Sequence, residues 1–113
     1  MMNVTFESIG NKLIIRINGD IDHHTCETVR QKIDNEIMKK NPKNIIFDMS
    51  NVGFMDSSGV GVIIGRFKQI SSKGGAAAMI NVKPQIKRVY EICGLNRIIG
   101  VYENLDKAVN DMQ

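Results

Sequence analysis

The residues best suited to chemistry in this 113-residue chain are Asp56, Ser57 and Ser58, which stand side by side. Asp56 is a good helix N-cap, because its carboxylate can accept hydrogen bonds from the N–H groups two and three residues on. The two serines would then lie in the first helical turn, where backbone N–H groups lack partners and the dipole is positive. This setting favours a phosphate, bound from outside or carried covalently on a serine. A capped helix with two small polar residues and no further role explains the same pattern.

A strand and a helix must position these three residues. The apolar run at 44–49 is typical of a buried strand. After the serines, apolar residues recur at the spacing of one helix face. The residues of that face are Val60, Ile63, Ile64 and Phe67. The serines therefore occupy a junction of strand, polar loop and helix N-terminus.

Ser58, Gly61 and Gly65 share a stripe of this helix that is turned away from the apolar face. A mid-helix glycine costs about 1 kcal/mol relative to alanine. Two on one side break a local rule, and such breaks tend to mark functional surfaces. We expect a docking face for the backbone of another protein. Three side chains would frame it: Val62, Arg66 and Lys68. The alternative is that core packing makes weak helix residues tolerable.

The rest of the chain alternates strands and helices without repeats or linkers. Strands are expected at 4–7, 12–18, 45–49, 76–82 and 98–102. Helices are expected to follow Thr25, to include the two serines, to start at Pro84 and to start after Asn104. The first two strands should form an antiparallel hairpin, and the second and third should be parallel around a right-handed crossover. The expected fold class is α/β: one domain over 1–113, with a single mixed sheet of about five strands and about four helices.

Parallel pairing of strands 12–18 and 45–49 brings the loops after them to the same pole of the sheet, where ligands meet such sheets. Asp22 lies in the first loop, and Asp56 and Ser57 lie in the second. Three roles are open to Asp22. It orients the Ser57 hydroxyl, it holds the metal of a nucleotide phosphate, or it only caps the first helix.

Composition excludes several classes of protein. The net charge of +3 and pI near 9.0 are mild, the basic residues are scattered, and 5% aromatic residues provide no stacking platform for nucleic acid. No apolar stretch approaches the roughly 20 residues that span a bilayer. The first eleven residues show no signal-peptide pattern. Cys26 and Cys93 fit apolar helix faces as buried free thiols. We therefore expect a cytoplasmic protein that binds neither nucleic acid nor membrane.

The usual catalytic and cofactor motifs are incomplete. Gly59 and Gly61 open a helix as in a dinucleotide-binding turn, but the third glycine is one residue late and the later acidic residue is missing. No phosphate-binding Gly-Lys-Ser/Thr loop and no Gly-x-Ser-x-Gly elbow exists. His23 and His24, with Cys26 and Glu27, make a weak metal candidate because adjacent side chains diverge. We expect no catalysis, no cofactor and no metal.

Three segments closely resemble the anti-sigma factor antagonist family: Asp-His-His-Thr at 22–25, Phe-Met-Asp-Ser-Ser-Gly-Val-Gly-Val-Ile at 54–63, and Gly-Arg-Phe-Lys-Gln-Ile at 65–70. The resemblance runs from the first strand to the last helix, and Asp-Ser-Ser-Gly is its most specific part. It implies the STAS fold, a mixed sheet with helices, in agreement with the strand and helix pattern.

By this resemblance, Ser57 is phosphorylated by an anti-sigma factor that is itself a serine kinase holding ADP or ATP. The unphosphorylated chain would bind that kinase and release a sporulation sigma factor, and a serine phosphatase would reverse the mark. The choice of Ser57 over Ser58 rests on the family, since both lie in one helical turn. Together with the helix surface, the resemblance gives this expected partner-binding set: Asp22, Asp56, Ser58, Gly59, Gly61, Val62, Gly65, Arg66 and Lys68.

A phosphate adds about −1.5 to −2 charges, which suggests an electrostatic release switch with little backbone change. Two other functions fit the sequence. One is a constitutive scaffold or sensor module of the same fold without a phosphorylation cycle. The other is a small nucleotide-binding enzyme, which would turn over substrate without a partner.

Overall fold

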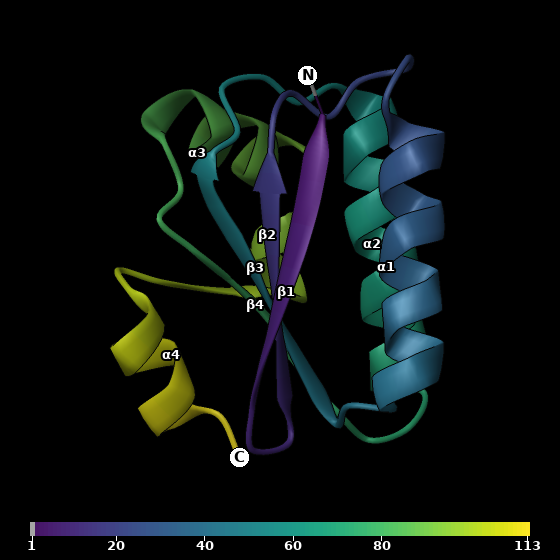
Figure 1. Cartoon of the computed structure of the whole chain (residues 1–113). Helices are drawn as coiled ribbons and strands as arrows, with labels where there is room; N and C mark the ends of the chain where they lie inside the picture. Colours follow the sequence, from purple (N-terminus) through teal and green to yellow (C-terminus); the bar gives the residue numbers. More distant parts are fainter. Residues whose placement is uncertain (1) are drawn as a thin grey trace.

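The computed structural model describes residues 2–113, so Met1 lies outside it, and these residues form one five-stranded sheet in chain order (Figure 1). The strands are β1 (Asn3–Ile9), β2 (Lys12–Asn18), β3 (Asn44–Asn51), β4 (Ala77–Ile80) and β5 (Gly100–Tyr102). β1 and β2 are antiparallel, and every later neighbouring pair is parallel. The prediction of a mixed sheet, with the second and third strands parallel, is confirmed.

The helices begin and end close to the local sequence signals. They are α1 (Cys26–Lys40), α2 (Ser57–Ser71), α3 (Pro84–Ile92) and α4 (Leu105–Asp111), with a 3-10 turn, η1 (Leu95–Arg97). Pro84 occupies the first turn of α3, and the Asn104 side chain accepts from the Lys107 N–H at 3.0 Å to cap α4. None of the helices in residues 2–113 is both long and apolar enough to cross a bilayer.

Two strands are shorter than predicted. β4 ends at Ile80 because Asn81 adopts a left-handed conformation, with φ of 56°. β5 begins at Gly100, since the N–H groups of Ile98 and Ile99 both donate to the Leu95 carbonyl and close the η1 turn. The apolar residues at 98–99 therefore belong to a turn, although their composition is typical of a strand.

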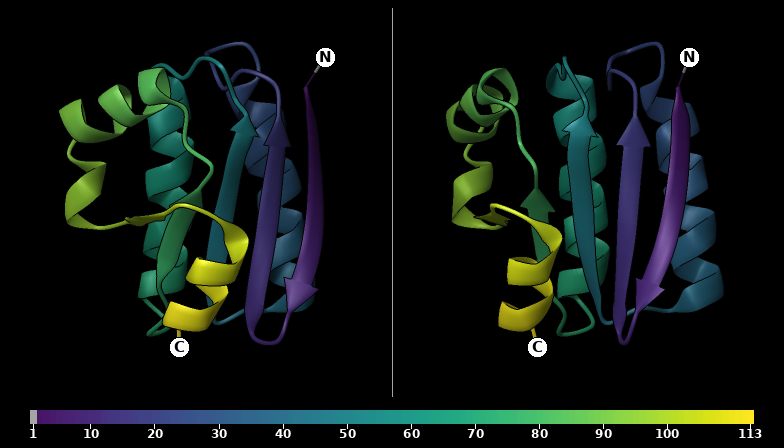
Figure 2. Two further views of the ribbon diagram at one scale, coloured as in Figure 1. Left: turned by 90° about the vertical axis from the view of Figure 1, so that its left-hand side faces the viewer. Right: turned by 60° about the vertical axis from the view of Figure 1, so that its left-hand side comes forward.

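The helices form layers on the two faces of the sheet. α1 and α2 lie side by side on one face, and α4 covers part of the other (Figures 1 and 2). The larger core lies under α1 and α2 and includes Ile15, Phe47 and Met79. A smaller core joins alternate residues of the strands to α4: Ile14, Ile46, Ile80 and Ala108. β3 is buried on both faces, which explains its continuous apolar run.

The cysteines are less buried than the sequence suggests. Cys26 is half-buried in the first turn of α1, whereas Cys93 is exposed. Cys93 lies beyond the end of α3, and Gly94 then turns the chain with φ of 76°. The apolar stripe of α3 therefore stops one turn short of it, so the expectation of two buried thiols is wrong for Cys93.

α2 packs against α1 as well as against the sheet, and this second contact buries Val62 and Arg66. Arg66 is only 8% exposed, and its Nε lies 2.9 Å from Asp34 Oδ1 of α1. The two atoms are close, but they are not aligned as a hydrogen bond requires. Within residues 2–113, Arg66 Nε and Nη1 therefore have no hydrogen-bond partner. Burial lowers the pKa of Arg66, and the charge of Asp34 opposes this. The expectation that Val62 and Arg66 frame an exposed surface is wrong.

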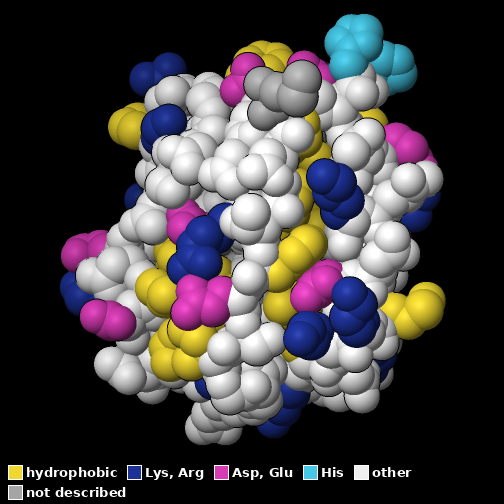
Figure 3. Space-filling view, in the orientation of Figure 1, with side chains coloured by type: hydrophobic (Ala, Val, Ile, Leu, Met, Phe, Trp, Pro, Cys, Tyr) yellow, Lys and Arg dark blue, Asp and Glu magenta, His cyan; other side chains and the backbone are white. Residues whose placement is uncertain are grey.

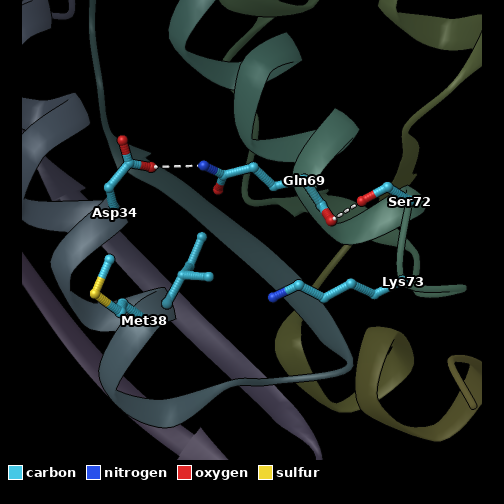
Figure 4. A pocket seen from close by; sticks show the side chains of 6 residues that line it. Asp34, Met38, Gln69, Ser72 and Lys73 are labelled. Carbon is cyan, nitrogen blue, oxygen red and sulfur yellow. Dashed lines mark hydrogen bonds between the residues drawn. The ribbon is translucent and has the colours of Figure 1, made fainter.

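Asp34 makes polar contacts both within α1 and across to α2. Its Oδ2 pairs with Arg30 Nη1 at 3.0 Å, and its Oδ1 accepts from Gln69 Nε2 at 3.3 Å. Beside it, a hollow of about 380 Å³ opens between the ends of the two helices (Figure 4). Its lining residues are Asp34, Ile37, Met38, Gln69, Ser72 and Lys73. At 1.5 Å per residue, the far end of α2 lies roughly 22 Å from its start, so this hollow is remote from the serines.

Removing Asp34 should be costly because it leaves the Arg66 guanidinium buried without its counter-charge. We expect Asp34→Ala to lower the free energy of unfolding by about 1–3 kcal/mol. Asp34→Ala combined with Arg66→Met should recover most of that loss, since the desolvated charge is gone. Urea unfolding measures both, with the exposed pair partner Glu103→Ala as a control that changes stability by less than about 0.5 kcal/mol. Equal losses in the single and double variants would contradict this account.

Candidate functional site

The loops after β2 and β3 are joined by backbone pairing. Ile21 and Met55, both buried, form a parallel bridge that continues the pairing of the two strands. The Ile21 N–H donates to the Phe54 carbonyl at 3.0 Å, and the Asp56 N–H donates to the Ile21 carbonyl at 3.3 Å. The prediction that Asp22 and the Asp56–Ser57 segment emerge at one pole is therefore confirmed. We call this end of the molecule the site pole.

Asp56 holds both loops with one carboxylate. Its Oδ1 accepts from the N–H groups of Ser58 at 2.9 Å and Gly59 at 3.2 Å, which confirms it as the N-cap of α2. Its Oδ2 accepts from the His23 N–H of the other loop at 3.2 Å. The start of α2 is thus fixed to the turn that leads into α1.

Asp22 caps the turn before α1. Its Oδ1 accepts from the N–H groups of His24 at 2.8 Å and Thr25 at 3.0 Å, and from the Thr25 hydroxyl at 3.2 Å. Desolvation works to raise the pKa of Asp22, but these hydrogen bonds outweigh it and hold the pKa below its ordinary value. Within residues 2–113 its side-chain hydrogen bonds all go to this turn, and the N-cap residue of α1 is Thr25. Asp22 therefore fixes the turn that leads into α1 rather than capping the helix itself.

The two serines differ in accessibility. Ser57, the first residue of α2, is exposed, whereas Ser58 is half-buried. An enzyme that approaches the site pole therefore meets Ser57 more readily than its neighbour. Residue spacing does not distinguish the two hydroxyls, because both lie in the first turn of the same helix.

The glycines of α2 have two distinct environments. A methyl group placed on Gly61 or Gly65 would meet nothing within 4 Å, so packing inside the chain gives no reason for either glycine. Gly59 is buried, and a Cβ there would lie 2.5 Å from the Ile21 carbonyl oxygen. Gly59 thus permits the close approach of the two loops. It is not available to a partner as expected, whereas Gly61 and Lys68 are exposed.

His23 and His24 stand at the site pole with exposed rings whose centroids are 5.5 Å apart. Residues 2–113 contain no group of three or more His, Cys, Asp or Glu side chains arranged to hold a metal ion.

Phe54 is a residue of this pole that the sequence pattern does not mark. It is 52% exposed, and Gly53 before it is exposed too, although Val52 and Met55 are buried. Large aromatic residues are on average strongly buried. A short apolar run gives no sign of which member points outward, so periodicity could not identify it.

Comparison with known proteins gives one consistent family. The family model described as STAS domain matches residues 3–108. An anti-sigma F factor antagonist of Paenibacillus polymyxa is 37% identical over 112 residues, which cover 99% of this chain and 96% of that protein. The structure of the anti-sigma factor antagonist SpoIIAA in its unphosphorylated form matches with a TM-score of 0.81 and 28% identity, over 96% of this chain and 94% of the other. SpoIIAA of Bacillus in the phosphorylated form matches with a TM-score of 0.73 and 28% identity, over 96% and 97%.

The contrast between Gly59 and Gly61 gives a direct test of the site geometry. Gly59→Ala should lower the free energy of unfolding by about 1–3 kcal/mol, because the new methyl group forces the two loops apart. Gly61→Ala should raise it by about 0.4–1 kcal/mol, since the site is open and alanine is the better helix former. Thermal and urea unfolding of the two variants measure this. The same sign for both would show that the loops are not in close contact at Gly59.

Proposed function

This chain belongs to the STAS domain family of anti-sigma factor antagonists, and we propose that it works by partner switching. In its unphosphorylated form it binds an anti-sigma factor that is also a serine kinase, and so releases a sporulation sigma factor. Phosphorylation of Ser57 by that kinase, which holds ATP or ADP, ends the binding, and a serine phosphatase restores it. On this proposal 1–113 is a single STAS domain that acts in the cytoplasm by binding rather than by catalysis.

The observation that carries the proposal is the exposed Ser57 at a helix start that Asp56 holds in place. A substrate serine must reach the γ-phosphate of the kinase nucleotide, so it has to protrude from a firm surface. Ser57 follows the residue whose carboxylate fixes the helix start and the neighbouring loop together. The comparisons support the same reading, because both phosphorylation states of SpoIIAA resemble this chain in fold.

The switch is electrostatic on this proposal. The Asp56 carboxylate already accepts from the Ser58 and Gly59 N–H groups, so a phosphate on Ser57 would share the helix start with an existing negative charge. The helix dipole favours the phosphate by about 0.3–1 kcal/mol, and repulsion from Asp56 opposes this. The net effect on the fold should be small. A partner whose own site holds a nucleotide phosphate would instead meet about two additional negative charges.

We propose that the docking face consists of the accessible members of the predicted set: Asp22, Asp56, Ser58, Gly61, Gly65 and Lys68. The open space over Gly61 and Gly65 supports this, since a partner backbone can approach a helix closely where side chains are missing. Gly59, Val62 and Arg66 support this surface from within.

The phosphorylation cycle is tested by mixing the protein with its host's anti-sigma kinase and ATP. We expect one added phosphate per chain by intact mass, mapped to Ser57 and absent in Ser57→Ala. Ser58→Ala, the matched control in the same turn, should still accept one phosphate. Ser57→Ala should also keep the sigma factor released when ATP is present, since the switch is locked. If Ser57→Ala changed neither phosphate transfer nor sigma-factor release, the chain would be a constitutive scaffold.

The docking face is tested by adding side chains to the glycines. Gly61→Gln and Gly65→Gln should each weaken binding to the ADP-loaded kinase by about tenfold or more, or ~1.4 kcal/mol, because they hold the partner away from α2. Both should fold normally, since the space over each glycine is open. Calorimetric titration measures the affinity, and Asp106→Gln on exposed α4 is the control. Unchanged affinity in both variants would place the interface elsewhere.

A further inference from the structure

The side chain of Phe54 is exposed, whereas its backbone is held by a hydrogen bond to another part of the chain. Its side chain is 52% exposed, although those of Val52 and Met55 are buried. Its carbonyl accepts from the Ile21 N–H at 3.0 Å, and the preceding carbonyl, of Gly53, accepts from Gln85 Nε2 at 3.5 Å. The ring is therefore displayed from a backbone held by two other parts of the chain. Burying such a group costs little conformational freedom, which is what an interface anchor needs.

Phe54 also lies close to the phosphorylation site. Only two residues lie between it and Ser57, so three Cα–Cα steps place their Cα atoms at most about 11 Å apart. A protein interface of standard size covers about 800 Å² on each partner, which corresponds to a radius of roughly 16 Å. An interface centred near Ser57 would therefore include Phe54.

One acidic side chain lies close to the backbone beside Phe54, although the chain as a whole carries a net charge of +3. Asp20 is exposed, and its Oδ1 would lie 3.5 Å from a methyl group placed on Gly53. Figure 3 shows acidic and basic side chains mixed over one face of the molecule, with hydrophobic side chains visible between them. The complement of this surface is an apolar pocket with a basic side chain on the Asp20 side.

We propose that Phe54 is the apolar anchor of the interface with the serine kinase: its ring enters an apolar pocket beside the kinase active site, and a lysine or arginine of the kinase meets Asp20. This inference rests on the proposed function and names the contact by which the same partner is held. Aromatic residues in desolvated central positions carry a large share of binding energy in protein interfaces. The kinase would then recognise the folded site pole rather than the serine in a peptide.

The test is Phe54→Ala, measured with the ADP-loaded kinase for binding and with the ATP-loaded kinase for phosphate transfer to Ser57. We expect the dissociation constant to rise by about tenfold or more and kcat/KM to fall by a similar factor. Phe54→Leu, which keeps an apolar group, should retain most of the affinity and guards against a folding defect. The control is Met38→Ala, which removes an 84% exposed apolar side chain beside the hollow at the far end of α1 and α2 and should change neither value.

The charge contact has its own measurement. Asp20→Asn should lower the association rate and flatten its dependence on salt, with little effect on the dissociation rate. If the wild-type chain is bound and phosphorylated while Phe54→Ala matches it in both measurements, Phe54 is not the anchor and the proposed function stands. If the wild-type chain is neither bound nor phosphorylated, the proposed function fails and this inference fails with it.

Discussion

The Asp56 carboxylate is the interaction on which the site pole depends. One oxygen satisfies the Ser58 and Gly59 N–H groups at the start of α2, and the other accepts from His23 in the turn before α1. The Ile21–Met55 bridge brings the two loops so close that residue 59 has no room for a Cβ. A cap, a bridge and a glycine therefore depend on one another, and together they fix where Ser57 is displayed.

This arrangement decides how a phosphate would act. A free helix N-terminus attracts an anion, but here the side chain of Asp56 already occupies two of the available donors. A phosphate on Ser57 would thus gain less from the helix than an open N-terminus offers, and it would lie next to a carboxylate. We therefore expect the chain to rearrange little around the new charge. The charge of the phosphate would then act mainly on a partner protein that faces it.

Local rules predicted much of this structure, and the misses along α2 share one physical cause. Asp56, Pro84 and Asn104 act within three residues of their own positions, so sequence patterns identified their roles correctly. The burial of Arg66 depends on Asp34, which is 32 positions earlier in the chain. A helical wheel assigns α2 one apolar face, but contact with α1 adds a second. The need for Gly59 likewise arises from Ile21 across the loop pair.

One side of α2 stabilises the helix by packing, and the other side includes the residues that are exposed to solvent. Toward the sheet and α1 it buries Val60, Ile63 and Arg66, and this packing holds the helix even though it contains glycines at exposed position 61 and half-buried position 65. Packing within the described chain gives no reason for Gly61 or Gly65, and Phe54 is 52% exposed. Each is unfavourable for an isolated domain. Unfavourable local choices without an internal counterpart, gathered along one helix and the loop before it, are most simply explained by a second protein that covers them.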